Sequence, residues 1–329
     1  RAALAKQVGA IKHAANEPIY RPEREAQVLH KIATANSGPL TDDAVQAVWR
    51  EIISACRAAE APLRVAYLGP QGTYSEQAVR AQFGVQVDAL PCLSFDEVFR
   101  TVETGSADFG VVPVENTTEG AVSRTLDLML TTPLVISAEL TLPIHHQLLT
   151  HNGTMEGIER ILDHPQAYAQ CQLWLARHFP SIPIETVSSN GEAARIAAEN
   201  SHTAAIASSL AATRYQLQIA AANIQDDPNN RTRFGVVGRY VTLPSGRDQT
   251  SLILSVPNKP GAVYEMLKPL ADYGVSMTRF ESRPAKNGQW EYYFYVDIQG
   301  HVKDPKITQA LDTLKARTAF FKVLGSYPV

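Results

Sequence analysis

The spacing of apolar residues changes twice along this chain, and the two changes divide it into three blocks. Residues 1–61 keep a helical spacing, in which apolar side chains recur every three or four positions. From residue 63 short apolar strands alternate with helical segments, and from residue 250 the order becomes strand, helix, strand, strand, helix, strand. The three patterns predict three domains, at residues 1–61, 63–244 and 248–329.

The first block is expected to contain three helices. Leu4, Val8 and Ile11 mark the first, Pro22 stands at the first position of the second, and Thr41 caps the third. Three helices in so short a segment bury little surface alone. We therefore expect this all-helical block to dimerise through its helices.

The central block alternates strands with helices, which predicts an α/β domain of about 180 residues. We expect strands at 63–68, 110–114, 134–140, 161–163, 185–188, 204–208 and 234–241, and helices at 94–103, 166–178, 191–199 and 209–215. The last block, with helices expected at 261–273 and 305–317, has the order of an α+β ferredoxin-like sandwich.

Composition excludes several classes of function. A chain with 45% hydrophobic and 19% charged residues is typical of a globular protein, and its net charge of −3 provides no field for nucleic acid or an anionic membrane. No apolar run approaches the roughly 18 residues of a membrane helix. Cys56, Cys92 and Cys171 lack metal-ligand spacing, so we expect a reduced cytoplasmic location and no metal.

Three polar turns follow strands of the central block, at residues 69–75, 113–120 and 188–191. Free backbone N–H groups and the macrodipole at a helix start favour an anion. We expect the turns to meet in one cleft, although each side chain could instead cap a helix. Their candidate site residues are Thr73, Ser75, Glu115, Asn116 and Asn190.

The run Asn229-Asn230-Arg231-Thr232-Arg233-Phe234 sets one hydroxyl between two guanidinium groups at the start of a strand. Such a hydroxyl can donate to a departing oxygen while the cations hold carboxylates. Alternatively, the two asparagines form a turn and the rest simply opens the strand.

Six motifs in order carry a family resemblance. They are Gly69-Pro70-Gln71-Gly72-Thr73-Tyr74-Ser75, Pro113-Val114-Glu115-Asn116-Thr117, His164-Pro165-Gln166-Ala167, Ser189-Asn190, Ile224-Gln225-Asp226 and the run 229–234. Together they resemble the prephenate dehydratase family, with Thr117 where members often have serine. The resemblance implies two α/β lobes, as in type II periplasmic binding proteins, with the active cleft between them.

The resemblance also implies a chemistry for Thr232. Prephenate is a dianion that loses carbon dioxide and hydroxide as its ring becomes aromatic. Thr232 would donate a hydrogen bond to the leaving oxygen, because a threonine hydroxyl is too weak an acid to ionise at neutral pH. Arg233 is expected to anchor a carboxylate, and Arg231 to serve structure alone.

The first block resembles the chorismate mutase domain often fused ahead of this dehydratase, through the segments at 8–12 and 20–25. Arg1 and Lys12 lie three helical turns apart, about 16 Å. Charges on a helix are commonly just a solvated face, but here the resemblance implies a chorismate site with no nucleophile and no cofactor. The residues expected to bind chorismate are Arg1, Lys12, Arg21, Arg24, Glu25, Cys56 and Glu60.

Within that site, the resemblance implies that Arg1 and Arg24 bind carboxylates, Lys12 contacts the ether oxygen and Glu25 binds the ring hydroxyl. Cys56 and Glu60 replace the serine and glutamine of some members. An ionised Glu60 would repel charge growing on the ether oxygen, so we expect it to be protonated there, and mutase activity to fall as pH rises. A further arginine is expected upstream of Arg1.

The last block resembles the ACT regulatory domain of these enzymes, through the segments at 258–263 and 279–284. Without the resemblance, the first segment would be interpreted as a turn and the second as the end of a strand. The resemblance implies phenylalanine binding at an interface between domains, and Val263 stands where leucine is usual. The expected regulatory residues are Asn258, Gly261, Ala262, Val263, Glu281, Ser282, Arg283 and Pro284.

These expectations combine into a homodimer or larger oligomer that converts chorismate to prephenate and prephenate to phenylpyruvate, with phenylalanine as inhibitor. One alternative is a monofunctional prephenate or arogenate dehydratase whose helices only dimerise. Another is a non-catalytic small-molecule sensor, since two lobes also suit pure binding. The Thr232-Arg233 pair argues against the sensor.

Overall fold

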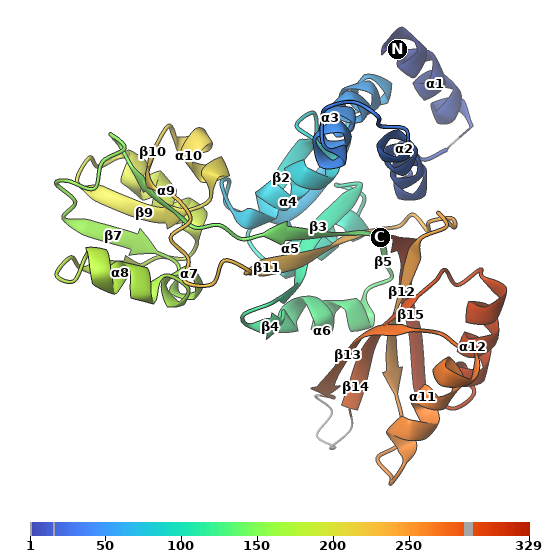
Figure 1. Cartoon of the computed structure of the whole chain (residues 1–329). Helices are drawn as coiled ribbons and strands as arrows, with labels where there is room; N and C mark the ends of the chain where they lie inside the picture. Colours follow the sequence, from blue (N-terminus) through green and yellow to red (C-terminus); the bar gives the residue numbers. More distant parts are fainter. Residues whose placement is uncertain (1, 16, 286–291) are drawn as a thin grey trace.

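The computed structural model describes residues 2–15, 17–285 and 292–329. Figure 1 shows the helical block at one end of the chain, the two lobes of the central block, and a C-terminal sandwich below the first lobe. The helices and strands follow the three patterns of the sequence.

The helical block consists of α1 (Ala2–Ala14), α2 (Pro22–Thr34) and α3 (Asp42–Glu60). As expected, Pro22 opens α2, and the Thr41 hydroxyl caps α3 by accepting a hydrogen bond from the Ala44 amide at 3.3 Å. Helices α1 and α3 cross closely, because a Cβ added at Gly9 would lie 2.8 Å from the Cα of Glu60.

The first lobe is a mixed sheet with the strand order β2-β1-β3-β11-β5, to which β4 adds beside β3. Its strands are β1 (Arg64–Leu68), β2 (Asp88–Cys92), β3 (Phe109–Asn116), β4 (Gly120–Ala121), β5 (Val135–Pro143) and β11 (Arg231–Gly238). Helices α4 (Tyr74–Phe83), α5 (Phe95–Glu103) and α6 (Ser123–Thr131) belong to the same lobe.

The second lobe has the strand order β10-β6-β9-β7-β8. Its strands are β6 (Gln147–Thr150), β7 (Arg160–Asp163), β8 (Ile184–Thr186), β9 (Thr203–Ala207) and β10 (Gln218–Ala221), and its helices are α7 (Pro165–Ala169), α8 (Gln172–His178), α9 (Asn190–Ala198) and α10 (Ser209–Tyr215). The chain crosses between lobes twice, after β5 and before β11. This arrangement confirms the expected pair of α/β lobes.

Several elements differ from the expectation. The helix expected at 166–178 is two short helices, α7 and α8, separated at Gln170 and Cys171. The elements β2, α6, β6 and β10 were not expected. Strand β2 contains Pro91 at the edge of its sheet, where a residue without an N–H group is tolerated, so its sequence lacks a regular strand pattern.

The C-terminal block has the expected strand and helix order. Its sheet has the order β13-β14-β12-β15, and its helices are α11 (Ala262–Asp272) and α12 (Pro305–Lys315). The strands are β12 (Asp248–Ser255), β13 (Met277–Pro284), β14 (Tyr292–Gln299) and β15 (Phe320–Pro328). The sheet packs on the first lobe, where the Tyr295 hydroxyl donates to the Leu126 carbonyl at 2.8 Å.

The helical block also packs on the first lobe. Tyr20 is fully buried, with its ring 4.9 Å from that of Phe83 and 5.1 Å from that of Phe109. The Tyr240 hydroxyl donates to buried Glu23 at 2.8 Å. The first lobe is therefore the scaffold on which both terminal blocks dock.

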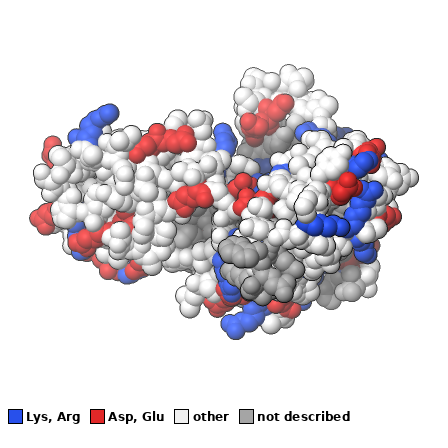
Figure 2. Space-filling view, turned by 90° about the horizontal axis from the view of Figure 1, so that it is seen from below, with Lys and Arg blue, Asp and Glu red and all other residues white. Residues whose placement is uncertain are grey.

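None of the helices in the described part of the chain has the length and apolar character needed to span a bilayer. On the face shown in Figure 2, acidic and basic side chains are interspersed. The described basic side chains on that face form no continuous surface.

Candidate active sites

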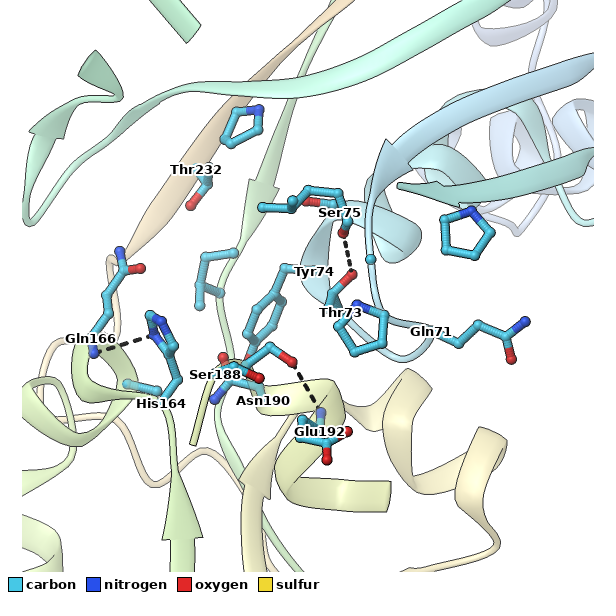
Figure 3. A pocket seen from close by; sticks show the side chains of 18 of the residues that line it. Gln71, Thr73, Tyr74, Ser75, His164, Gln166, Ser188, Asn190, Glu192 and Thr232 are labelled. Atoms are coloured by element: carbon cyan, nitrogen blue, oxygen red, sulfur yellow. Dashed lines mark hydrogen bonds between the residues drawn. The ribbon is translucent and has the colours of Figure 1, made fainter. Parts of the chain in front are cut away.

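A cleft of about 1040 Å³ lies between the two lobes, near the upper end of the usual range for small-molecule sites. Residues from motifs far apart in the sequence surround it (Figure 3). Five of the expected site residues line it, namely Thr73, Ser75, Asn116, Asn190 and Thr232. Folding therefore brings together the turns that the sequence analysis expected to meet.

Thr232 is oriented by a neighbouring amide. Asn116 is the last residue of β3 and pairs with Thr232 of the neighbouring strand β11. Its Nδ2 atom lies 2.9 Å from the threonine Oγ1 atom. The Asn116 Oδ1 atom accepts the backbone N–H groups of Thr118 and Glu119, at 2.9 and 3.2 Å. Because Oδ1 is thereby the acceptor, Nδ2 must donate to Thr232. The threonine hydroxyl hydrogen is then free to be donated into the cleft.

Further buried side chains continue this arrangement toward the second lobe. Asn230, which is 1% exposed, accepts from Asn116 Nδ2 at 2.9 Å and donates to Gln170 Oε1 at 2.7 Å. The His146 Nε2 atom lies 2.9 Å from the same Gln170 oxygen. Since that oxygen accepts, His146 carries its hydrogen on Nε2.

The remaining ring nitrogen of His146 faces Tyr74, whose hydroxyl lies 2.8 Å from Nδ1. Burial lowers the pKa of His146, which favours the neutral ring, and the Tyr74 hydroxyl also lies 3.0 Å from the His145 carbonyl oxygen. A continuous hydrogen-bonded chain thus runs from Tyr74 to Thr232 through both lobes. Gln170 and His146 were not predicted from the sequence, and Asn230 was predicted only as part of the motif run 229–234 or, alternatively, of a turn.

Two helices begin at the cleft. Thr73 caps α4 by accepting the Glu76 amide at 3.4 Å, and Ser189 caps α9 by accepting the Glu192 amide at 3.0 Å. The two helix starts approach closely, because a Cβ added at Gly191 would lie 2.4 Å from the Gln71 carbonyl oxygen. First-turn N–H groups of both helices are therefore available to an anion.

The polar residues at these helix starts have partly structural roles. The Thr73 hydroxyl also donates to the Leu68 carbonyl at 3.1 Å. Asn190 donates to the Ile206 carbonyl at 2.9 Å and to Asp163 at 3.3 Å. Asp163 is fully buried, and burial raises its pKa to about 8. Ser75, at the second position of α4, lines the cleft.

Arg233 and Glu115 do not line the cleft, contrary to expectation. Successive side chains of a strand point to opposite faces, so Arg233 faces away from Thr232. Its guanidinium lies 2.8 Å from Asp297 and 3.6 Å from Glu139, and Glu115 pairs with Arg279 at 3.1 Å. Both residues face the C-terminal sheet instead.

A second pocket, of about 520 Å³, lies in the helical block. The residues expected there that line it are Lys12, Arg21, Arg24, Glu25, Cys56 and Glu60. Arg1 lies outside the described residues. Lys12 Nζ is 2.8 Å from Glu60 Oε2, so the two side chains expected at the ether oxygen pair with each other. The Nε atom of Arg21 lies 3.0 Å from Oε1 of Glu23.

Arg57 also lines this pocket, although it was not predicted from the sequence. It pairs with Glu25, with 2.5 Å between Nη1 and Oε1. Burial raises the pKa of Glu25, and the charge of Arg57 opposes that rise. No sequence signal separated Arg57 from the other charged residues of the third helix.

The expected regulatory residues lie on two elements of the C-terminal block. Gly261 caps α11 with φ of 79°, a left-handed conformation that favours glycine, and is followed by buried Ala262 and exposed Val263. Asn258 precedes this turn. Residues 281–284 lie on the edge strand β13, where Arg283 reaches Asp127 of α6 at 3.2 Å. Glu281 is half-buried, and Ser282 and Pro284 are exposed.

Three family models match the chain. They are prephenate dehydratase at residues 65–241, chorismate mutase type II at 1–61 and the ACT domain at 250–316. A bifunctional chorismate mutase/prephenate dehydratase of Neisseria gonorrhoeae is 49% identical, and the alignment covers 100% of this chain and 91% of that protein. The chain belongs to the bifunctional chorismate mutase/prephenate dehydratase family.

Two solved structures each resemble about four fifths of this family member. A prephenate dehydratase of Arthrobacter aurescens in complex with L-Phe is 34% identical, with a TM-score of 0.75, covering 81% of this chain and 90% of that one. GqqA, described as a novel type of quorum quenching acylase, is 30% identical, with a TM-score of 0.74, covering 81% and 98%. The second neighbour shows that a similar fold carries a different described activity.

Proposed function

We propose that this chain converts chorismate to prephenate in the helical pocket and prephenate to phenylpyruvate in the cleft between the lobes. The observation that carries the second reaction is the orientation of Thr232. Its oxygen accepts from Asn116 at 2.9 Å, so its hydrogen points to a partner in the cleft. A leaving hydroxyl is such a partner.

The dehydration then needs one donor at the leaving oxygen. Breaking the C–CO₂ bond releases carbon dioxide, its electron pair enters the ring, and the ring expels hydroxide at the opposite carbon. Thr232 donates to that oxygen as negative charge grows on it, and one proton taken up from solvent completes the water molecule. Aromatisation supplies the driving force.

Helix starts replace Arg233 as the proposed partners of the substrate carboxylates. The N-termini of α4 and α9 both open into the cleft, and each offers backbone N–H groups and the positive end of a helix dipole. Arg195 also lines the cleft, but its charge is balanced by Glu192 and Glu199, each at 2.8 Å. Fixed dipoles suit a substrate that changes charge during the reaction.

The mutase reaction is a pericyclic rearrangement, which requires a pocket that holds one compact conformer and stabilises charge on the ether oxygen. Arg24 and Arg21 are the described cations for the carboxylates, with Arg1 as a further candidate outside the described residues. Lys12 would turn from Glu60 to the ether oxygen when chorismate binds. Glu25 would accept the ring hydroxyl hydrogen.

Phenylalanine is the proposed inhibitor, acting through the C-terminal domain. The ACT family match and the related dehydratase solved with L-Phe both support this role. Strand β11 carries Thr232 toward the cleft and Arg233 toward Asp297 of that domain. A change in the C-terminal sheet could therefore reach the catalytic strand directly, which feedback control requires.

We also propose a homodimer or larger oligomer in the cytoplasm. Leu4 and Ile11 of α1 and Val48 of α3 are more than half exposed, an apolar surface that a second copy would cover. Strand β13 pairs only with β14 in the described sheet, which leaves an edge for a partner strand. All three cysteines are free thiols, which suits a reducing compartment.

Acyl hydrolysis, the activity described for GqqA, is less well supported. A hydrolase needs a nucleophile beside a base. Among the described cleft residues, no serine or threonine hydroxyl is hydrogen-bonded to a histidine ring, and His146 is committed to Tyr74 and Gln170. The geometry therefore favours dehydration.

The direct test assays both reactions on the purified full chain, with and without phenylalanine. Chorismate consumption and phenylpyruvate formation from prephenate are expected, the latter reduced by phenylalanine. Phenylpyruvate formation without chorismate consumption would leave a monofunctional dehydratase, and faster turnover of arogenate would reassign the substrate. Binding of prephenate without product would support the sensor.

A further inference from the structure

One helix of the first lobe reaches from the dehydratase cleft to Arg57, a residue that lines the mutase pocket. The N-terminal residue of α4, Tyr74, lines the cleft, and its last residue, Phe83, lies against the helical block. Ten helical residues span about 15 Å. The helix therefore links the cleft to the helical block that contains the mutase pocket.

Arg57 connects the end of this helix to the mutase pocket. Its side chain is only 6% exposed, and its two terminal nitrogens have different partners. Nη1 donates to Glu25 Oε1, and Nη2 donates to the backbone carbonyl oxygen of Phe83, each at 2.5 Å. One planar guanidinium thus binds a mutase carboxylate and a dehydratase carbonyl together.

The surroundings of Arg57 hold this orientation. The guanidinium carbon lies 5.1 Å from the centre of the Tyr20 ring and 5.7 Å from that of Phe83, distances at which aromatic faces attract cations. The Phe83 carbonyl belongs to the last turn of α4, where carbonyl groups lack partners within the helix and the dipole is negative. A buried cation is well placed there.

From this geometry we infer that Arg57 is a positioning residue of the mutase site, and that the dehydratase domain completes that site by holding Arg57 through the Phe83 carbonyl. The inference rests on the proposed mutase function. It makes docking of the helical block a requirement for full mutase activity, because a free helical block would lose the Phe83 partner and leave Arg57 less constrained. Glu25 would then lose its fixed orientation.

The charge of Arg57 also affects the ionisation of Glu25. Burial raises the pKa of Glu25, while Arg57 and Arg50 of α3 and Lys12 of α1 lower it. A carboxylate that accepts the substrate hydroxyl must be ionised. Removing Arg57 should raise the pKa of Glu25, so that Glu25 stays protonated up to a higher pH. The acid limb of the plot of mutase activity against pH should therefore move to higher pH.

The experiment compares Arg57→Ala and Arg57→Lys in the full chain. We expect mutase kcat/KM to fall roughly tenfold to hundredfold in the alanine variant, with the acid limb shifted upward. The lysine variant should lose less, because it keeps the charge but cannot hold both partners. Dehydratase turnover should stay within about twofold of wild type, which also reports correct folding.

Ser54→Ala is the matched control. Ser54 is buried in the same interface, where its hydroxyl accepts the Gln86 amide at 3.2 Å, but it does not contact Glu25. If Arg57 only holds the domains together, the two alanine variants should lower mutase activity alike. If Arg57 positions Glu25, only Arg57→Ala should move the pH profile.

A crystal structure of Arg57→Ala provides a readout that needs no turnover. The inference predicts that the Glu25 carboxylate leaves its position beside residue 57. An unmoved Glu25 carboxylate, or a wild-type mutase pH profile in the active variant, would overturn the inference. Failure of the wild-type chain to consume chorismate would instead count against the proposed mutase function, and the crystal structure would still decide the role of Arg57.

Discussion

The Nδ2 atom of Asn116 lies 2.9 Å from the Oγ1 atom of Thr232, and two backbone N–H groups fix the amide so that Asn116 is the donor. The catalytic hydroxyl proposed here is therefore an acceptor on its protein side and a donor on its cleft side.

Asn116→Asp should reverse the polarity at nearly constant shape. A carboxylate would accept the Thr232 hydrogen and compete with the leaving oxygen for it. We expect dehydratase kcat to fall roughly hundredfold, in the range typical for loss of one transition-state donor. Steady-state formation of phenylpyruvate measures this, and an Asn116→Asp variant with wild-type kcat would contradict the assigned polarity.

Asp297→Asn should weaken inhibition by phenylalanine while leaving uninhibited turnover nearly unchanged. The substitution removes the charge 2.8 Å from Arg233, on the strand that carries Thr232. We expect the phenylalanine concentration for half inhibition to rise about tenfold. Asp272→Asn is the control, because it removes a charge from a half-exposed ion pair with Lys268 on α11. Phenylalanine should inhibit this variant as strongly as it inhibits the wild type.

Asp163→Asn should stabilise the protein increasingly as pH rises. Burial raises the pKa of Asp163 in the folded state to about 8, whereas the unfolded carboxyl ionises near its ordinary value of 3.8. Between these values the folded state binds one more proton, so its stability falls by roughly 1 kcal/mol per pH unit. Asparagine does not ionise, so the Asp163→Asn variant does not lose this stability as pH rises.

Urea unfolding at pH 5 and pH 8 measures the effect of Asp163→Asn. The free energy of unfolding of the variant, relative to wild type, should be clearly higher at pH 8 than at pH 5. An equal difference at the two pH values would mean that Asp163 does not titrate in this range.

Glu60→Gln should raise mutase activity. A neutral amide cannot repel charge on the ether oxygen, and it frees Lys12 from the ion pair that the structure shows at 2.8 Å. We expect kcat/KM for chorismate consumption to rise about threefold or more. An unchanged or lower kcat/KM would contradict the role assigned to Glu60.

Much of this architecture could be predicted from sequence because it depends on local patterns. The starts of α2 and α3 could be predicted because Pro22 and Thr41 are typical residues at a helix start. The order of elements in the two terminal blocks follows from the spacing of neighbouring apolar residues. Thr232 and Asn116 were found because each lies in a motif at a strand end.

The interactions that position those residues could not be predicted in the same way. Gln170 and His146 lie 62 and 86 positions from Thr232, and only the crossing of the two lobes brings them near it. Arg233 was misplaced because alternation along a strand shows that neighbours face opposite sides, but not which side is the cleft. Arg57 depends on docking between domains, for which the sequence of the third helix has no signal.

The central claim is that the Thr232 hydroxyl assists the loss of hydroxide from prephenate. The most direct test compares dehydratase kcat in Thr232→Ser, which keeps the hydroxyl, with kcat in Thr232→Val, which keeps the shape. We expect the serine variant to keep substantial turnover, and the valine variant, like Thr232→Ala, to lose about a hundredfold or more with little loss of folding. A valine variant that forms phenylpyruvate at the wild-type rate would contradict the claim.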